Sequence, residues 1–239
     1  MTDRNSLVGR LIPFLLQRRY EPGDRVPSER ELAERFKVSR GQIREALSFL
    51  EALRIIERRA KSGVYMAAAD ISLEALGLFA QLGIPLTAAD VRQSVELRRI
   101  HEIAAIRLAC ERRTADNVAR LCAILDSEAR HVAAGESMAE HDRLFHGEIV
   151  RATQNGVFSR MVDIFYIMTA SHRSRYFRDP RRGRESHEQH VRMFAAIERC
   201  DAAGAGELMT AHLRDVDSYW QQLIEQDDAP MAQPADAEG

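Results

Sequence analysis

The chain has 239 residues and a formal net charge of −2, with 45% hydrophobic and 29% charged residues, the balance of an ordinary globular protein. It has no run of about 18 apolar residues that would span a membrane, and its N-terminus lacks the apolar core and cleavage site of a secretory signal. The three cysteines are scattered and match neither a disulfide framework nor a paired metal site. We therefore expect a cytoplasmic protein without a membrane segment.

The charge is unevenly distributed along the chain. Residues 1–66 hold 14 Lys and Arg against 9 Asp and Glu, a net charge of +5, whereas residues 67–239 have a net charge of −7. This division suits a basic domain that meets nucleic acid, joined to a domain that does not. A difference of this size also arises by chance, so it needs support from motifs.

A helix-turn-helix pattern runs from Pro27 to Leu47 in the sequence PSERELAERFKVSRGQIREAL. Ser28 and Glu31 fit a capping box for the first helix, and Ser39 fits the N-cap of the second. Residues 37–38 form the turn between them. The apolar side of the second helix consists of Ile43, Ala46, Leu47 and Leu50.

Arg40 and Arg44 lie one turn apart on the other face of the second helix, near its N-terminus. In a helix-turn-helix, residues at these positions reach into the major groove. A surface hairpin with solvated arginines would share the pattern. Two short strands at residues 55–56 and 64–66, joined by a basic turn, favour DNA binding because they predict a winged helix. Gly63 in that turn permits close backbone approach to phosphate.

Beyond a short linker at residues 67–72, the pattern is helical throughout. The predicted helices cover residues 73–82, 88–111, 114–134, 137–153, 156–175, 184–200 and 202–226, with Thr87 and Thr114 as candidate N-caps and loops at 83–85 and 178–183. The predicted fold class is mainly α. It comprises an N-terminal winged helix-turn-helix (residues 1–69), an all-helical antiparallel bundle of six to seven helices (residues 70–226) and a disordered acidic tail (residues 227–239).

A metal-ligand pattern lies in the helical region, where all eight histidines follow residue 100. Asp142 and His146 are four residues apart, which places a carboxylate and an imidazole on one helical face. His190 and His212 lie on two later helices and could converge with them. One carboxylate and three imidazoles suit a divalent metal ion, zinc first and nickel or manganese as alternatives, with positions left for water or a ligand.

Spacing alone leaves other combinations open. His141 with Asp142, or His187 with His190, compete with this set, and a lone helical histidine is more often capped or solvated than a ligand. The pair His141-Asp142 is also typical of metal-dependent phosphohydrolases. Those enzymes need an upstream histidine and a downstream aspartate, which we cannot place in the required order.

Taken together, the motifs resemble those of the GntR family of transcriptional regulators. The family pattern PSERxLAxxxxVSRxxVREAL is matched by residues 27–47, and the helical region is similar to the ligand-binding domain of the FadR subfamily, called FCD. The FCD-like segments are ELRRIHEIAAIRLA at residues 96–109, DRLFH at 142–146, the run from His190 through Ile197 to Asp201, and MTAHL at 209–213.

The resemblance implies a set of residues at the DNA interface. They are Arg30, Ser39, Arg40, Gly41 and Arg44 in the helix-turn-helix, and Lys61, Ser62 and Gly63 at the wing tip. Two positions depart from the family pattern. Gly41 replaces the usual threonine and so lacks a hydroxyl contact. The family's base preference at this position therefore does not transfer to this chain. Arg54 replaces a glycine before the wing, so it must avoid the left-handed conformation or accept strain.

In the helical region the family's metal ligands fall on Asp142, His146, His190 and His212. Arg98 is the arginine of a Glu-x-Arg motif that, in similar proteins, faces the carboxylate of the effector, a task that suits a bidentate guanidinium. An ion pair with Glu102, one turn later, is the structural alternative for Arg98, and the two roles can coexist.

The resemblance implies a ligand-responsive repressor and not an enzyme. We expect a homodimer whose two winged helices bind double-stranded DNA at an inverted-repeat operator. A small organic acid held by the metal and Arg98 would shift the pose of the DNA-binding domains and release the operator. Two alternatives stay open. The metal ion itself could be the effector, or the chain could be a metal-dependent hydrolase fused to a DNA-binding module, with Glu148 among the scattered candidate bases.

Overall fold

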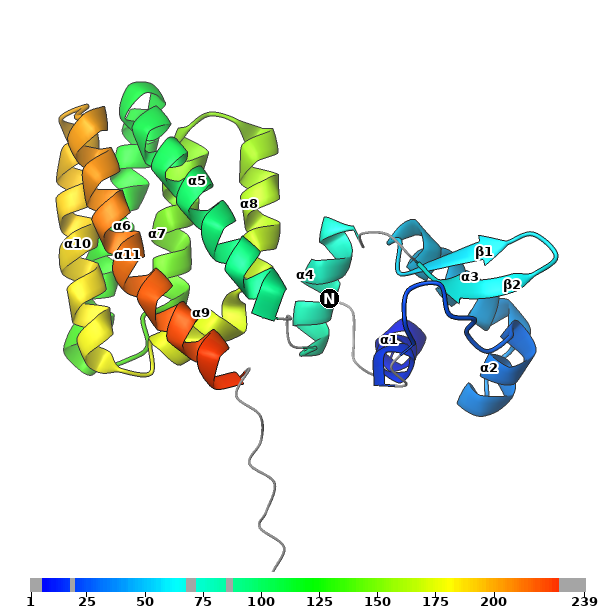
Figure 1. The fold of residues 1–239 in the computed structure, drawn as a ribbon. Coiled ribbons are helices and arrows are strands. Elements are labelled where there is room, and N and C mark those ends of the chain that lie inside the picture. The colour runs from blue at the N-terminus through cyan, green and yellow to red at the C-terminus, as the bar shows by residue number, and fades with distance from the viewer. Residues whose placement is uncertain (1–5, 18–19, 68–71, 85–87, 228–239) are drawn as a thin grey trace, which may run out of the picture. The chain divides into compact units, whose positions relative to one another are not determined.

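The computed structural model describes residues 6–17, 20–67, 72–84 and 88–227, and the chain divides into two compact units between residues 86 and 87 (Figure 1). The first unit contains helices α1 (Leu7–Gln17), α2 (Glu29–Phe36), α3 (Arg40–Ala52) and α4 (Leu73–Leu82), and strands β1 (Ile56–Arg59) and β2 (Gly63–Met66). The predicted N-cap at Thr87 and the predicted disorder of residues 228–239 lie outside the described residues.

The helix-turn-helix forms because local capping fixes both helix starts. The Ser28 side chain accepts the backbone N–H of Glu31, and the Glu31 carboxylate accepts the backbone N–H of Ser28 at 2.8 Å. Ser39 and Gln42 repeat this arrangement at the start of α3. Each capping box satisfies donors that have no partner within the helix, so the predicted helix starts are correct.

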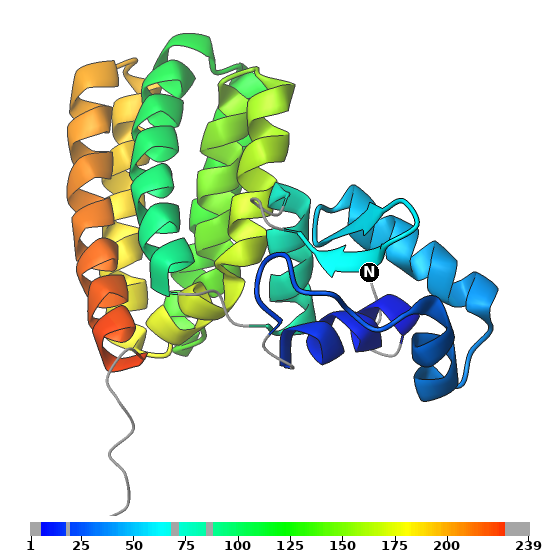
Figure 2. The ribbon, with the colours of Figure 1, turned by 45° about the vertical axis from the view of Figure 1, so that its right-hand side comes forward.

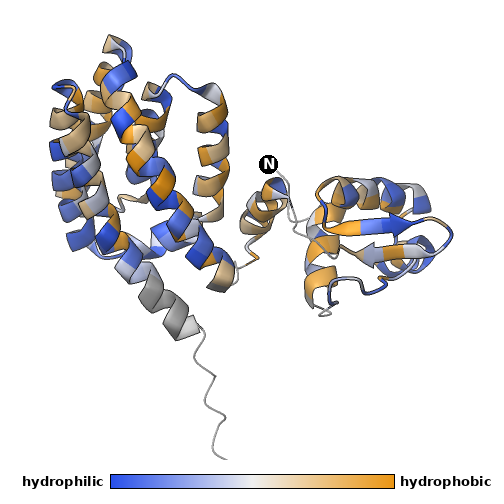
Figure 3. Ribbon diagram, turned by 45° about the horizontal axis from the view of Figure 1, so that its top comes forward, coloured by the Kyte–Doolittle hydropathy of each residue, from blue (hydrophilic) through white to orange (hydrophobic). Residues whose placement is uncertain are grey.

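The hairpin after α3 is the predicted wing. Strands β1 and β2 are antiparallel, with Ile56 opposite Met66 and Arg59 opposite Gly63. Figure 3 shows hydrophilic residues around the hairpin tip. Gly63 has a φ of +136°, and an added Cβ would come within 3.0 Å of the Arg25 guanidinium. Both observations explain why this position carries glycine.

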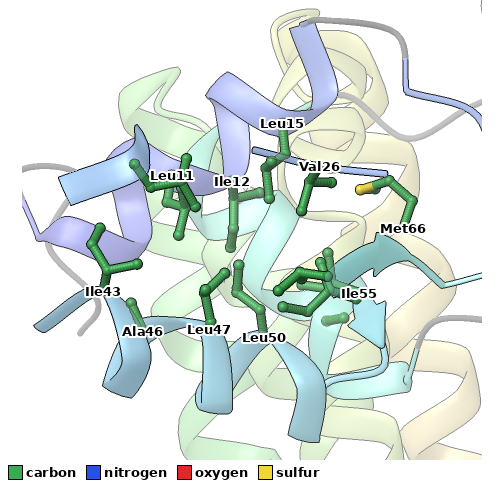
Figure 4. Packing of buried hydrophobic residues seen from close by; sticks show 14 of the residues in the cluster. Leu11, Ile12, Leu15, Val26, Ile43, Ala46, Leu47, Leu50, Ile55 and Met66 are labelled. Carbon is green, nitrogen blue, oxygen red and sulfur yellow. The ribbon is translucent and has the colours of Figure 1, made fainter. Parts of the chain in front are cut away.

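The core of the first unit includes helix α1, which is not among the helices predicted from the sequence. Leu11, Ile12 and Leu15 of α1 are fully buried and pack over α3 and the wing (Figure 4). Their spacing is helical, but Pro13 lies inside the helix and obscures the pattern because proline removes a backbone donor there.

Helix α4 also belongs to the first unit, whereas the sequence placed residues 70–82 in the second domain. Its buried residues Ala75, Leu78, Phe79 and Leu82 join the core of the winged helix. Periodicity predicted the bounds of this helix correctly, but periodicity does not reveal against which core an apolar face packs.

The second unit is a bundle of seven helices within the described part of the chain. They are α5 (Ala88–Arg112), α6 (Ala115–Ala134), α7 (Ala139–Ala152), α8 (Gly156–Met168), α9 (Ala170–Tyr176), α10 (Pro180–Glu198) and α11 (Ala202–Asp227). Helices α5 and α11 run side by side (Figures 1 and 2), and α7 packs against α5, α6, α8 and α9. None of the described helices is both long and apolar enough to cross a bilayer.

Two predicted boundaries in the bundle are wrong. The expected single helix over residues 156–175 is interrupted at Thr169, whose hydroxyl and backbone N–H both donate to the Phe165 carbonyl, an arrangement that bends helices. The expected loop at 178–183 is largely helix, because α10 begins at Pro180 with Asp179 as its N-cap. Proline is favoured at the first helical position, where its missing N–H costs nothing.

Candidate metal centre and DNA-binding surface

The residues predicted to contact DNA lie on α2, at the start of α3 and on the wing, and all of them except Gly63 are exposed. Arg30 is on α2, and Arg40, Gly41 and Arg44 are on the first two turns of α3, all of them exposed. A Cβ at Gly41 would meet nothing closer than the Ser39 hydroxyl at 3.8 Å, so the missing side chain leaves open space.

The Ser39 side chain caps the N-terminus of α3. Its hydroxyl accepts the Gln42 N–H at 3.2 Å and lies 3.0 Å from the Gln42 side-chain oxygen, to which it donates. A phosphate contact by this hydroxyl would have to displace that bond. The adjacent N-terminus of α3 offers backbone N–H groups and the positive end of the helix dipole instead.

At the wing, Lys61 and Ser62 are exposed at the tip, whereas the two arginines of β1, Arg58 and Arg59, contact other side chains of the same unit. Arg58 donates to the Arg44 carbonyl at 2.9 Å and to the Ser48 hydroxyl at 3.0 Å, which ties the wing to α3. Arg59 lies over the Tyr65 ring, with 4.1 Å from its guanidinium carbon to the ring centroid. Arg58 therefore holds the wing against α3, and Arg59 packs within the hairpin.

Arg54 accepts backbone strain. Its φ is +58°, in the left-handed region that the family's glycine tolerates. For a residue with a Cβ this conformation costs about 1–2 kcal/mol. The strain is compatible with the fold because the Arg54 N–H donates to the Glu51 carbonyl and the Ile55 N–H donates to the Leu50 carbonyl, which close the C-terminus of α3.

The four predicted metal ligands lie together in the bundle. Asp142 and His146 come from α7, His190 from α10 and His212 from α11, and one ligand atom from each lies within 4.8 Å of all the others. The His146 and His212 Nε2 atoms are 3.2 Å apart, and the Asp142 Oδ1 lies 3.6 Å from the His146 Nε2. All four side chains are buried.

Each histidine of the cluster is oriented by an acceptor on its other nitrogen. The Nδ1 atoms of His146 and His190 lie 2.9 Å from carboxylate oxygens of Glu102 and Glu128, and the His212 Nδ1 lies 2.6 Å from the Gln189 side-chain oxygen. Acceptors at Nδ1 fix the tautomer that carries its proton there, which leaves each Nε2 with a lone pair.

This arrangement fits a divalent cation. The lone pairs of three Nε2 atoms converge. The Nε2 atoms of His146 and His212 are only 3.2 Å apart, and with both protons on Nδ1 no hydrogen lies between them, so a cation there would relieve the repulsion of their lone pairs. Burial, followed by His146, His190 and Arg98, lowers the pKa of His212 well below its usual range, so this imidazole is neutral, as a ligand must be. The Asp142 Oδ2 is buried and accepts no hydrogen bond in the described structure.

Arg98 extends the cluster on its α5 side. Its Nη2 lies 3.9 Å from the Asp142 Oδ2 and its Nε lies 3.7 Å from the Glu102 Oε1, so the predicted pair with Glu102 is present as an ion pair. Neither nitrogen donates a hydrogen bond within the described structure, although both are buried. Burial opposes the charge of Arg98, but Tyr166, Asp142 and Glu102 outweigh it and raise the pKa.

The alternative metal combinations are not assembled. His141 is turned toward α6, where its Nε2 lies 3.0 Å from the Ser127 hydroxyl, and His187 lies against Glu128 at 3.0 Å. Glu148, the candidate base of the enzyme alternative, is engaged by Asn117 and Arg120, each at 2.8 Å. Its carboxylate is therefore part of a structural network.

Sequence reasoning missed several residues that position these sites. They are Glu102, Glu128, Gln189 and Tyr166 around the cluster, and Arg25 and Glu29 in the winged helix. Glu102 had a sequence signal only as an ion-pair partner for Arg98, one helical turn away, and none for its contact with His146. Glu128 had none, because it is 62 residues from His190 in sequence.

Comparisons with known proteins agree with this architecture. The profile of bacterial regulatory proteins of the gntR family matches residues 4–66, and that of the FCD domain matches residues 93–215. The chain is 30% identical to the HTH-type transcriptional regulator LutR of Bacillus subtilis, over 82% of this chain and 91% of LutR. It is 26% identical to the HTH-type transcriptional repressor NanR of Cronobacter sakazakii, over 88% of this chain and 82% of NanR.

A solved structure shows the same fold. It is described as Lar, which controls the expression of the Listeria monocytogenes agr system, and it aligns with a TM-score of 0.64 at 16% identity, covering 93% of this chain and all of that one. The matched families and relatives are transcriptional regulators, in agreement with the prediction that the chain is not an enzyme. The chain belongs to the GntR family, with a DNA-binding winged helix and a C-terminal FCD domain of the FadR type, and is a ligand-responsive transcriptional regulator.

Proposed function

We propose that this regulator is a repressor that releases its operator when a small carboxylic acid binds at the buried cluster of the FCD domain. The observation that carries the proposal is a set of buried polar atoms there that form ion pairs but make no hydrogen bond. Within the described residues, the Asp142 Oδ2 accepts no hydrogen bond, and the Arg98 Nε and Nη2 donate none. Buried donors without acceptors cost about 1–3 kcal/mol each, and a carboxylate would satisfy those of Arg98.

Asp142, His146, His190 and His212 would hold a divalent ion, zinc first and nickel or manganese as alternatives. When bound, the ion would supply a Lewis-acidic position for a carboxylate oxygen. Arg98 would orient that carboxylate with its fork. Glu102, Glu128 and Gln189 would keep the imidazoles in the ligating tautomer.

On the DNA side, the proposal assigns base contacts to Arg40 and Arg44, and backbone contacts to Arg30, the α3 N-terminus and the wing residues Lys61, Ser62 and Gly63. Arg25 joins this set, because its guanidinium lies against Gly63 at the wing. The net charge of +5 over residues 1–66 supports this assignment through attraction to phosphate.

We further propose a homodimer that binds an inverted repeat. Large apolar side chains are exposed on two neighbouring helices of the bundle, with Leu97 and Ile100 on α5 and Val157 and Met161 on α8. Large apolar residues exposed on adjoining helices favour a protein interface. Replacement of Ile100 by Asp should shift the mass measured by light scattering toward the monomer, and an unchanged mass would exclude this face.

The repressor role takes support from NanR, which is named a transcriptional repressor. The experiment that tests the whole proposal begins with duplexes selected from a random pool by the full-length protein. A thermal-shift screen of metabolic carboxylic acids on zinc-loaded protein then identifies a ligand, because a ligand of the native state raises the melting temperature. That acid should release the selected duplex from zinc-loaded protein.

Two outcomes would redirect the proposal. If zinc alone changes the affinity for the duplex and no acid adds to the effect, the metal is the effector. If an acid strengthens DNA binding, the protein is not a repressor relieved by its ligand.

A further inference from the structure

We propose that Glu29 orients the Arg44 guanidinium and thereby sets the base preference of the recognition helix. Glu29 would act as a positioning residue without touching a base itself. The inference rests on the proposed function, in which Arg44 of α3 contacts a base edge. It adds a residue of α2 to the specificity of the protein.

The contact between the two side chains is well defined. The Arg44 Nη2 donates to the Glu29 Oε2 at 3.0 Å, and the Arg44 Nε lies 3.3 Å and 3.4 Å from the two carboxylate oxygens. The side chain of Glu29 is 23% exposed, whereas that of Arg44 is 62% exposed. A partly buried carboxylate at the start of α2 therefore pairs with a guanidinium that projects from α3 into solvent.

This contact leaves a particular edge of the guanidinium available. A guanidinium offers one pair of donors on its Nε–Nη2 edge and another on its Nη1–Nη2 edge. Glu29 occupies the first edge, so the second remains for a base. Guanine presents O6 and N7 as paired acceptors in the major groove, which match such a fork. Without Glu29, Arg44 could turn either edge to a base or reach a phosphate.

The backbone that carries Arg44 is fixed as well. Arg58 of the wing donates to the Arg44 carbonyl at 2.9 Å and to the Ser48 hydroxyl at 3.0 Å. The Arg58 backbone N–H donates to a Glu51 carboxylate oxygen at 3.1 Å. Side chain and backbone of Arg44 are thus each tied to a different element, α2 and β1.

Arg30 provides the contrast. It pairs with Glu34 on its own helix at 3.3 Å, and both side chains are about two-thirds exposed, at 67% and 65%. Such an exposed i,i+4 pair contributes little and leaves the arginine mobile. A mobile arginine suits a phosphate contact, whereas the restrained Arg44 suits a base contact.

Because Glu29 is charged, its removal should change the affinity for the preferred sequence and the affinity for other sequences in opposite directions. A carboxylate near DNA repels phosphate, so its removal should strengthen binding to any sequence. If Glu29 orients Arg44, its removal should at the same time weaken binding to the preferred sequence. A carboxylate that merely competes with DNA for Arg44 would weaken both kinds of binding, and its removal would strengthen both.

The test uses Glu29→Gln in the full-length protein, with fluorescence anisotropy on the duplex selected by the wild type and on a scrambled duplex at one salt concentration. We expect affinity for the selected duplex to fall about tenfold, while affinity for the scrambled duplex stays equal or rises. Selection repeated with the variant should lose a guanine preference in each half-site. Stronger binding to both duplexes, or an unchanged ratio of the two affinities, would overturn the proposal.

Two controls separate the alternatives. Glu45→Gln removes the same charge from an exposed position of α3 beside Arg44 and should leave the ratio unchanged. Arg44→Ala should lower the ratio, and Glu29→Gln added to it should lower it no further. If Arg44→Ala has no effect, the proposed base contact by Arg44 fails. If only Glu29→Gln has no effect, the proposed role of Glu29 fails alone.

Discussion

The winged helix and the FCD domain use charged side chains in opposite environments. Arg44 in the winged helix is 62% exposed, whereas Arg98 in the bundle is 5% exposed and lies among the buried Asp142 and Glu102. A solvent-exposed charge keeps its hydration and contributes little to the free energy of folding. A buried charge loses its hydration, which destabilises the fold unless the charge has a partner. Substitutions should therefore change DNA affinity without loss of fold in the first unit, and change ligand binding and stability together in the second.

The largest effect expected from this contrast is that of His190→Ala. Loss of one of four ligands should lower metal affinity by more than the ~10–100-fold that is typical for loss of a supporting residue. Elemental analysis of the purified protein should find little metal. His131→Ala, a histidine outside the cluster with a side chain 34% exposed, should keep the wild-type content. Full metal content in His190→Ala would exclude the four-residue site.

On the DNA side, Arg44→Ala should lower affinity for the selected duplex by about 2 kcal/mol, or about 30-fold, as expected for one lost bidentate base contact. The fold should be intact because the side chain is exposed. Anisotropy measures the first quantity and thermal melting the second. A matching loss of melting temperature would show that the contrast between the units does not hold for this residue.

Glu128→Gln should have a smaller effect on the metal, about tenfold in affinity. The amide oxygen can still accept the His190 Nδ1–H, but it no longer carries the charge that makes the imidazole a better ligand. Competition with a chromogenic zinc chelator measures the affinity. Glu188→Gln, exposed on α10, serves as the control. Equal affinities in both variants would argue that Glu128 only packs against the site.

The smallest expected effect is an increase in stability. Arg54→Gly should raise the free energy of unfolding of the first unit by about 0.5–1 kcal/mol, because relief of the left-handed strain exceeds the entropy that glycine adds to the unfolded chain. Calorimetry on the full chain would detect the shift. Arg54→Ala keeps the strain and should give no gain. If both variants are equally stable, Arg54 is not strained.

The sequence predicted what local chemistry determines. The capping box at Ser28 and the N-cap at Ser39 marked the two helix starts, and the spacing of Asp142 and His146 placed two candidate ligands on one face. Contacts between residues far apart in sequence were not predictable. No sequence pattern around Glu128 indicates that it contacts His190. Helix α4 shows the same limit, because its apolar face had two possible cores and periodicity does not distinguish them.

The proposed coupling of the two units depends most directly on Arg98 and the metal acting together. The decisive measurement is acid-induced release of the selected duplex, followed by anisotropy, for zinc-loaded wild type, wild type stripped with a chelator, and zinc-loaded Arg98→Lys. Lysine keeps the charge but loses the fork. We predict release only from the zinc-loaded wild type, with DNA affinity before addition of acid unchanged in Arg98→Lys. Equal release from all three proteins would contradict the proposal.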